Sequence, residues 1–282
     1  MPSKVNMQFA EFLAKKRYRF RTDGDGFIIP SKIHSKPDVT IVFLGGSTTE
    51  CLFVNEDKRF PYLAGRLIES KTNVKINSYN SGVAGNNTLH LIDILLNKII
   101  PINPDVVILM ENFNDLISLL YDQSYWNNSP TRSLIVEAQP SIKGLVRDAV
   151  KLGLPNLGRL CLQIYLDFFP PDEWRHVRKK KININKSELV SQYKMNLETF
   201  VKLCETRNIT LVFMTQANRL KESPDEIVRY EVDIHVGTRG VEYYEFKQIY
   251  DMFNQVMREV ASNKGIKLID LAKEVPQEKE YI

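Results

Sequence analysis

The sequence predicts an α/β protein whose core is a parallel β-sheet with helices on both faces. Short strand-like apolar runs alternate along the chain with segments whose apolar residues recur at helical spacing. Two of the runs, residues 39–44 and 105–110, are nearly continuous in apolar residues, as strands buried on both faces are. Five strands with intervening helices predict a doubly wound, five-stranded parallel sheet, whose ligand site lies at the carboxyl ends of the strands.

The order of the elements follows from the same patterns. Strands are expected at residues 39–44, 74–79, 105–110, 209–214 and 266–270. The second of them alternates polar and apolar residues, as a half-buried or edge strand does. Helices are expected where Tyr62, Leu63, Leu67 and Ile68 share one face, at 88–100 before Pro101, at 189–204, and at 241–263, which Gly265 caps.

Residues 117–186 interrupt this rhythm. The segment is roughly 70 residues long, carries aromatic and basic clusters, and contains five prolines, at positions 130, 140, 155, 170 and 171. A crossover between two strands does not need that length. We interpret the segment as a mostly helical cap insertion that lies over the strand ends, within a single domain of residues 1–282 and not as a second domain.

Length and composition bound the classes of protein that the chain can represent. Its 282 residues carry 38 basic and 34 acidic side chains, a net charge of +4, which is too small to indicate nucleic-acid binding. Hydrophobic residues make up 43% and charged residues 26%, which excludes a disordered chain, collagen and a disulfide-dense miniprotein. No run reaches the roughly 18 apolar residues of a membrane span. The three cysteines, Cys51, Cys161 and Cys204, are widely spaced, and we interpret them as buried free thiols.

The N-terminal segment lacks the pattern of a signal peptide, because its first apolar group, residues 9–14, is short and interrupted by charge. The sequence as it stands is therefore expected in the cytoplasm, whereas a chain that has lost a leader would be periplasmic or membrane-anchored. Two basic runs, 15–21 and 175–181, are interpreted as solvated faces or oligomer contacts. The first is also compatible with a preceding anchor and the second with anionic glycan or lipid headgroups, but no nucleic-acid-binding motif accompanies either.

The first candidate motif is Gly45-Gly46-Ser47-Thr48, where the first strand ends. Two glycines allow a sharp turn, after which Ser47 would be exposed at the start of a helix, where backbone N–H groups can hold a developing oxyanion. The pattern is equally compatible with a phosphate-binding turn of a flavodoxin-like protein or with a serine N-cap. It is not a P-loop, because no Gly-Lys-Ser/Thr follows at the required spacing.

Polar turns also follow the second and third strands. Residues 80–88 place Gly82 and Gly85 before a helix, which suggests a backbone that approaches a ligand closely. Residues 111–115, Glu-Asn-Phe-Asn-Asp, follow the third strand, where asparagine and aspartate are common turn or cap residues. Each motif is bland alone, but three of them at successive strand ends predict one site at this edge of the sheet.

In this order the three blocks resemble those of the SGNH hydrolases, also called GDSL esterases and lipases. The first block, Gly-Asp-Ser, matches residues 45–47 in the Gly-Gly-Ser-Thr form of bacterial members, so that Gly46 stands where the family usually has aspartate. The second block matches Asn80 and Gly85. The third, Gly-x-Asn-Asp, matches residues 112–115, with Asn112 in place of glycine. The likeness covers residues 39–115 and extends loosely to 270, with residues 213–216 similar to the family's fourth strand end.

The resemblance implies a flavodoxin-like SGNH hydrolase fold and a set of catalytic groups. Ser47 would be the nucleophile, and the oxyanion hole would consist of the backbone N–H groups of Ser47 and Gly85 and the side-chain amide of Asn114. Converging neutral donors of this kind fit the charge of a tetrahedral acyl-transfer intermediate. The side chain of Asn112 would narrow the acyl pocket or alter the turn. No metal or cofactor is implied.

A serine nucleophile needs a base, which the family supplies from an Asp-x-x-His block beyond the fifth strand. The sequence ends at residues 279–282, about where that block would begin, and we expect a truncated chain in preference to an inactive relative or one with an atypical base. Among substitutes, His34 precedes the first strand and His90 lies in the helix after Gly85. His176 stands in a basic run. His235, expected in a polar loop after the fourth strand, is the one histidine predicted to reach the strand ends.

The function predicted from these residues is a serine esterase that removes a small acyl group, most plausibly acetyl, from a carbohydrate or another small ester. The same groups can deliver the acyl group to an alcohol, so an O-acyltransferase acting on a glycan is a close variant. A non-catalytic binding protein that keeps the oxyanion pocket without a base is the alternative from another class. The partners expected are thus a small ester or glycan, and the oligomeric state is not predicted.

Overall fold

The computed structural model describes residues 18–126 and 182–278. The chain divides into two compact units, one formed by Met1–Tyr125 with Lys181–Ile282 and the other by Trp126–Lys180. All strands and helices described below belong to the first unit. Most of the expected cap, residues 127–181, lies outside the described residues, as do Cys161, His176 and the basic run 175–181.

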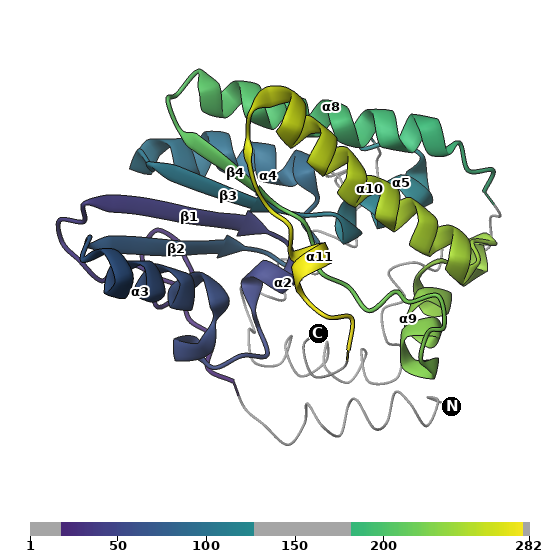
Figure 1. Cartoon of the computed structure of the whole chain (residues 1–282), viewed down its shortest axis with the longest axis horizontal. Coiled ribbons are helices and arrows are strands. Elements are labelled where there is room, and N and C mark those ends of the chain that lie inside the picture. Colours follow the sequence, from purple (N-terminus) through teal and green to yellow (C-terminus); the bar gives the residue numbers. More distant parts are fainter. Residues whose placement is uncertain (1–17, 127–181, 279–282) are drawn as a thin grey trace, which may run out of the picture. The chain divides into compact units, whose positions relative to one another are not determined.

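A five-stranded parallel sheet forms the centre of the first unit (Figure 1). Its strands are β1 (Val39–Gly45), β2 (Ile76–Gly82), β3 (Val106–Met110), β4 (Thr210–Met214) and β5 (Lys267–Ile269). They are ordered β2-β1-β3-β4-β5, which is the flavodoxin-like order, and every neighbouring pair is parallel. The predicted fold class and all five predicted strands are confirmed, although β2 begins and ends later than expected.

The helices cover both faces of this sheet. In chain order the α-helices are α2 (Ser47–Glu50), α3 (Phe60–Thr72), α4 (Thr88–Ile94), α5 (Phe113–Asp122), α8 (Lys186–Glu205), α9 (Glu226–Val236), α10 (Tyr243–Lys264) and α11 (Leu271–Glu274). The expected helix at 88–100 continues beyond α4 as a π-helical turn, Leu95–Ile99, and a 3-10 turn, Ile100–Ile102, that contains Pro101. Helix α5 takes up the first residues of the expected cap, and the first unit continues to Tyr125, which is buried, instead of ending at 117.

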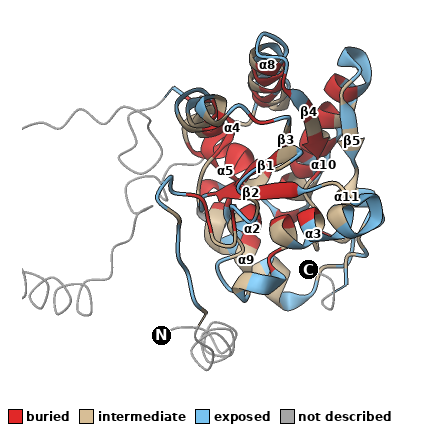
Figure 2. Ribbon diagram, turned by 90° about the vertical axis from the view of Figure 1, so that its left-hand side faces the viewer, coloured by how far each residue is buried: buried red, intermediate tan, exposed pale blue. Residues whose placement is uncertain are grey.

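Strand alternation divides the core into two layers. Ile41 and Phe43 of β1 join Ile108 of β3 in a cluster that packs against Phe60 of α3 and Leu271 of α11. The alternate residues of the two strands point to the opposite face, which α4, α5, α8 and α10 cover, and they are fully buried. They are Val42 and Leu44 of β1 and Val107 and Leu109 of β3. Figure 2 shows the buried residues gathered in the sheet and on the inner sides of these helices.

The apolar face predicted for α3 is not its buried face. Leu63 and Leu67 are 44% and 55% exposed, and the helix instead buries Pro61 and Gly65. A Cβ atom on Gly65 would lie 2.5 Å from the Cβ atom of Ser78 in β2. The absence of a side chain at position 65 therefore lets the helix axis approach the sheet, and small residues form the contact that periodicity had assigned to leucines.

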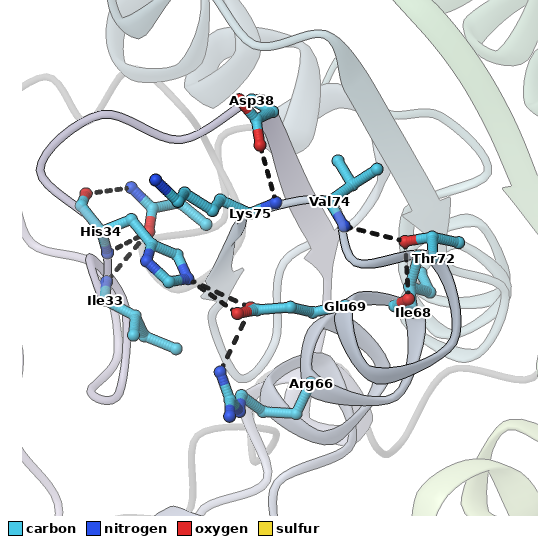
Figure 3. A network of polar contacts seen from close by, with 10 residues as sticks. Ile33, His34, Asp38, Arg66, Ile68, Glu69, Thr72, Val74 and Lys75 are labelled. Atoms are coloured by element: carbon cyan, nitrogen blue, oxygen red, sulfur yellow. Dashed lines mark hydrogen bonds and ion pairs between the residues drawn. The ribbon is translucent and has the colours of Figure 1, made fainter.

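A polar network joins the segment before β1 to α3 and β2 (Figure 3). The Nε2 atom of His34 lies 3.1 Å from both carboxylate oxygens of Glu69, which also pairs with Arg66 at 3.1 Å. The backbone N–H and C=O groups of His34 bond the side chain of Asn77, near the start of β2. These contacts place His34 at the amino-terminal edge of the sheet, away from the strand ends where the candidate motifs gather.

We expect Gly65→Ala to lower the free energy of unfolding by about 1–3 kcal/mol, because its methyl group would overlap the Cβ atom of Ser78 unless α3 and β2 move apart. Gly24→Ala is the matched control, since a Cβ atom there would meet nothing within 4 Å. Urea titrations of both variants beside the wild type measure the difference. Equal stability of the two variants would contradict the close contact between α3 and β2.

Candidate active site

The turn after β1 presents Ser47 to solvent. Gly46 precedes α2 with φ −85° and ψ −150°, and Ser47 is the first residue of that four-residue helix, with an exposed side chain. Asn80 fixes the turn from the neighbouring strand: its Nδ2 atom donates to the carbonyl of Thr49 at 2.8 Å, and its Oδ1 atom accepts from the N–H of Gly82 at 2.9 Å. The second block of the sequence therefore supports the helix that carries Ser47.

The loop between β2 and α4 contains Gly85, which adopts a left-handed φ of 82°. Next to it, the carbonyl of Asn86 accepts a hydrogen bond of 2.9 Å from the Nδ2 atom of Asn114, at the start of α5. Asn87 caps α4 and donates from its Nδ2 atom to Ser118 Oγ of α5. Hydrogen bonds thus join the turns that follow β2 and β3. Gly85 immediately precedes Asn86, whose carbonyl group accepts from the Asn114 amide.

Ser47 and Asn114 line one cavity of about 440 Å³. The remaining wall comes mainly from the segment after β4, from α9 and from α10, and includes Thr48, Phe113, Gln216, Arg219, Leu220, Ile227, Val228, Glu231, Val232, His235, Phe246 and Tyr250. Two of the three predicted site residues therefore share a cavity, and the third, Gly85, lies in the adjoining loop.

Gln216 is a part of the site to which the sequence assigned no role. Its Nε2 atom donates to Thr48 Oγ1 at 3.0 Å, and its Oε1 atom accepts from the N–H of Phe113 at 3.1 Å. One side chain beyond β4 thereby connects the Ser47 turn to the start of α5. The available signal was its position two residues after a buried strand, in the segment similar to the family's fourth strand end.

We predicted His235 in a loop, but it lies near the end of α9. This segment is a regular helix whose first turn is capped by Asp225. Its ring stands edge-on to Phe113, with 5.5 Å between the ring centroids, and it lines the cavity of Ser47. His90 belongs to a capping box, since its Nδ1 atom accepts from the N–H of Asn87 at 3.2 Å. Of the histidines in the described residues, His235 is the one that lines this cavity.

Two carboxyl groups are buried beneath the site. Glu111, 1% exposed, accepts the N–H groups of Asn112 and Asn114 on its Oε1 atom at 3.1 and 3.0 Å. Asp115, fully buried, accepts from the N–H and hydroxyl of Thr88 and from the hydroxyl of Tyr125. Asp115 therefore holds the first turn of α4, while Glu111 holds the first turn of α5.

Burial raises the pKa of both acids, and their mutual repulsion raises that of Glu111 further, to about 8. Three hydrogen-bond donors, the N–H and hydroxyl of Thr88 and the hydroxyl of Tyr125, oppose the rise in the pKa of Asp115, so Asp115 is the more acidic of the two. Their mutual repulsion favours the state in which one carboxyl group of the pair keeps its proton near neutral pH. The phenols of Tyr193 and Tyr250, which face this region, have pKa values well above 10 because they are buried beside negative charge.

Asn112 does not narrow the cavity. Its side chain is fully buried and donates from Nδ2 to the carbonyl of Tyr250 at 3.1 Å and to Oδ1 of Asn254 at 2.9 Å, both in α10. Of the two effects expected for an asparagine at this position, the one on the acyl pocket is therefore wrong. The side chain instead attaches the end of β3 to the helix behind it.

The described residues contain no group of three or more histidine, cysteine, aspartate or glutamate side chains that could hold a metal ion. Within the same residues, no helix is long and apolar enough to cross a membrane. Cys51 is half-buried and Cys204 is buried, and both are free thiols.

Comparisons with known proteins add a family. The profile of the GDSL-like Lipase/Acylhydrolase family matches residues 43–281. A search of curated proteins finds no match.

Among solved structures, Axe2, an acetylxylan esterase from Geobacillus stearothermophilus, is 12% identical with a TM-score of 0.46, over 83% of this chain and 76% of that one. The acetyl xylan esterase AlAXEase is 14% identical with a TM-score of 0.45, over 84% of this chain and 79% of its own. LAE5, an alpha/beta hydrolase from the metagenome of Lake Arreo in Spain, is 14% identical with a TM-score of 0.44, over 83% and 78%.

The raised pKa of Glu111 predicts a pH-dependent stability. The folded protein keeps on Glu111 a proton that the unfolded chain loses near pH 4.5, so the free energy of unfolding falls as pH rises toward about 8. Asp115 contributes in the same direction, but only up to about pH 6. Between pH 6.5 and 8.5 we expect the wild type to lose at least about 1.4 kcal/mol relative to Glu111→Gln, the equivalent of one pKa unit. Urea unfolding across this range measures it, and parallel pH profiles for the two proteins would refute it.

Proposed function

Because the chain belongs to the GDSL-like lipase/acylhydrolase family, we propose that it is a serine esterase with Ser47 as its nucleophile. Its substrate would be a carbohydrate or another small ester carrying a small acyl group, and acetyl is the group to test first. The observation that carries the proposal is the meeting of an exposed serine and a buried asparagine amide in one cavity at the strand ends. A volume of about 440 Å³ lies in the range of small-molecule sites.

The reaction proceeds in two acyl transfers. Ser47 Oγ attacks the ester carbonyl carbon while its proton passes to a base, and the tetrahedral oxyanion is held by the N–H groups of Ser47 and Gly85 and the amide of Asn114. Collapse expels the alcohol, which takes a proton, and leaves an acyl-serine. Water then attacks the acyl carbon, and the acid and free Ser47 are released. Each oxyanion donor contributes about 10²–10³ in rate.

The base in this scheme is the residue that most needs assignment. Among the described histidines, His235 lines the cavity of Ser47, while His34 is paired with Glu69 and His90 is engaged at the cap of α4. His235→Ala therefore belongs in the same experiments. A rate loss as large as that of Ser47→Ala would make His235 the proton acceptor, and an unchanged rate would place the base elsewhere.

We expect Ser47→Ala to abolish hydrolysis of aryl acetates and to abolish labelling by a fluorophosphonate, because the attacking oxygen is removed. Its free energy of unfolding should stay within about 0.5 kcal/mol of the wild type, since an exposed hydroxyl contributes little to packing. Ser70→Ala, an exposed serine of α3, is the control and should keep both reactions. Mass spectrometry that locates the adduct on another residue, or activity retained by Ser47→Ala, would remove Ser47 from this role.

Asn114→Ala should lower kcat about 10²–10³-fold with a smaller change in KM, because the amide acts mainly on charge that develops in the transition state. The variant also loses the hydrogen bond to Asn86, so a destabilisation of about 1 kcal/mol is expected and circular dichroism must first establish that it is folded. A change confined to KM would make Asn114 a substrate-binding residue.

A further inference from the structure

At position 46 the neighbouring side chains, and not the backbone conformation, leave no room for a side chain. The φ of −85° at Gly46 lies outside the left-handed region, so an L-residue could adopt the same conformation. A Cβ atom there would lie 2.5 Å from Glu111 Oε2, and the Nδ2 atom of Asn114 would be closer still. The space next to the backbone of Gly46 is therefore already filled by the side chains of Glu111, directly after β3, and of Asn114, in α5.

Glu111, one of the side chains that fill this space, also supports the start of α5, which carries Asn114. Glu111 is almost fully buried, and its Oε1 atom accepts the N–H groups of Asn112 and Asn114, while its Oε2 atom faces Gly46. One carboxyl group is thus in contact with the residue before Ser47 and with the backbone that carries the Asn114 amide. Tyr193 fixes the Glu111 backbone in turn, because its hydroxyl donates to the Glu111 carbonyl at 2.7 Å.

We propose that Glu111 is a positioning residue whose carboxyl group stands in for the aspartate that the family's first block carries at position 46. The carboxyl group reaches the same space from β3 and not from β1, and it sets the distance between Ser47 and the amide of Asn114. The proposal rests on the proposed function, in which Ser47 attacks and Asn114 holds the oxyanion.

A swap of the two positions tests the proposal. Gly46→Asp alone places two side chains in one space, and Glu111→Ala alone leaves the N–H groups of Asn112 and Asn114 without their acceptor. Each single variant should lower the rate constant for fluorophosphonate labelling of Ser47 by at least about tenfold, or about 1.4 kcal/mol in barrier. The double variant Gly46→Asp/Glu111→Ala should label at least about threefold faster than either single variant, because contacting residues couple strongly. Recovery is expected to be partial, since the Cβ atom of an aspartate at position 46 still displaces the Nδ2 atom of Asn114.

A second double variant, Gly46→Val/Glu111→Ala, fills the space without a carboxyl group and is expected to stay at the low rate. If valine restored the labelling rate constant as fully as aspartate does, the proposal would be overturned, because filling the space would then account for the recovery without a carboxyl group. Multiplicative losses in Gly46→Asp/Glu111→Ala, or wild-type labelling by Glu111→Ala, would overturn it too.

The melting temperatures of the same variants separate this proposal from the proposed function. Failure of wild-type Ser47 to react with the fluorophosphonate refutes the proposed function, whatever the variants do. In that case a swap that restores the melting temperature still supports the placement of the carboxyl group, and one that does not restore it refutes that placement. A wild type that reacts, beside a swap that rescues neither quantity, refutes the positioning role alone.

Discussion

The candidate site depends on the register of the parallel sheet, in which β1, β2 and β3 end at the same level. Gly45 of β1 pairs with Gly82 of β2 on one side and with Met110 of β3 on the other. The three strands therefore end at one level, and each is followed by a turn that is not part of the sheet. The switch point of the sheet lies between β1 and β3, where helices depart to opposite faces and a crevice opens. Displacing any one strand by a residue would separate the groups that now meet there.

Strand register does not by itself orient the turns that follow β2 and β3. Hydrogen bonds to the buried carboxyl groups of Asp115 and Glu111 fix their orientation. Asp115 binds the N–H and hydroxyl groups of Thr88, and Thr88 Oγ1 also accepts from Asn196 of α8. A buried carboxylate is costly unless hydrogen bonds replace its hydration, so these partners cannot be exchanged independently. Glu111 serves α5 in the same way. The two acids stabilise opposite sides of one loop cluster, and their repulsion is relieved when one of them keeps its proton.

The sequence predicts what local pattern determines, and it fails where contacts between distant residues decide. Four apolar runs and one alternating segment identified the five strands, and the polar turns after three of them predicted that Ser47 and Asn114 lie at one site, where they line the same cavity. The buried face of α3 was predicted wrongly, because periodicity counts leucines and gives no weight to Gly65, whose missing side chain permits the close approach. His235 was expected in a loop, since the Asp225 cap of α9 follows a polar stretch without a strong apolar pattern.

Glu111 could not have been assigned a role from the sequence, because its significance lies in a contact with Gly46, 65 positions earlier, that only folding creates. Gln216, which links Thr48 to Phe113, and Asn112, which links β3 to α10, also act through contacts that only folding creates. These side chains join the Ser47 turn to α10, which forms part of the cavity wall. We therefore expect a substitution in that part of α10 to act also on the geometry of Ser47 and Asn114. Under the proposed function, substrate preference and catalytic rate are therefore expected to be coupled, because residues that line the cavity and residues that position Ser47 and Asn114 belong to one hydrogen-bonded network.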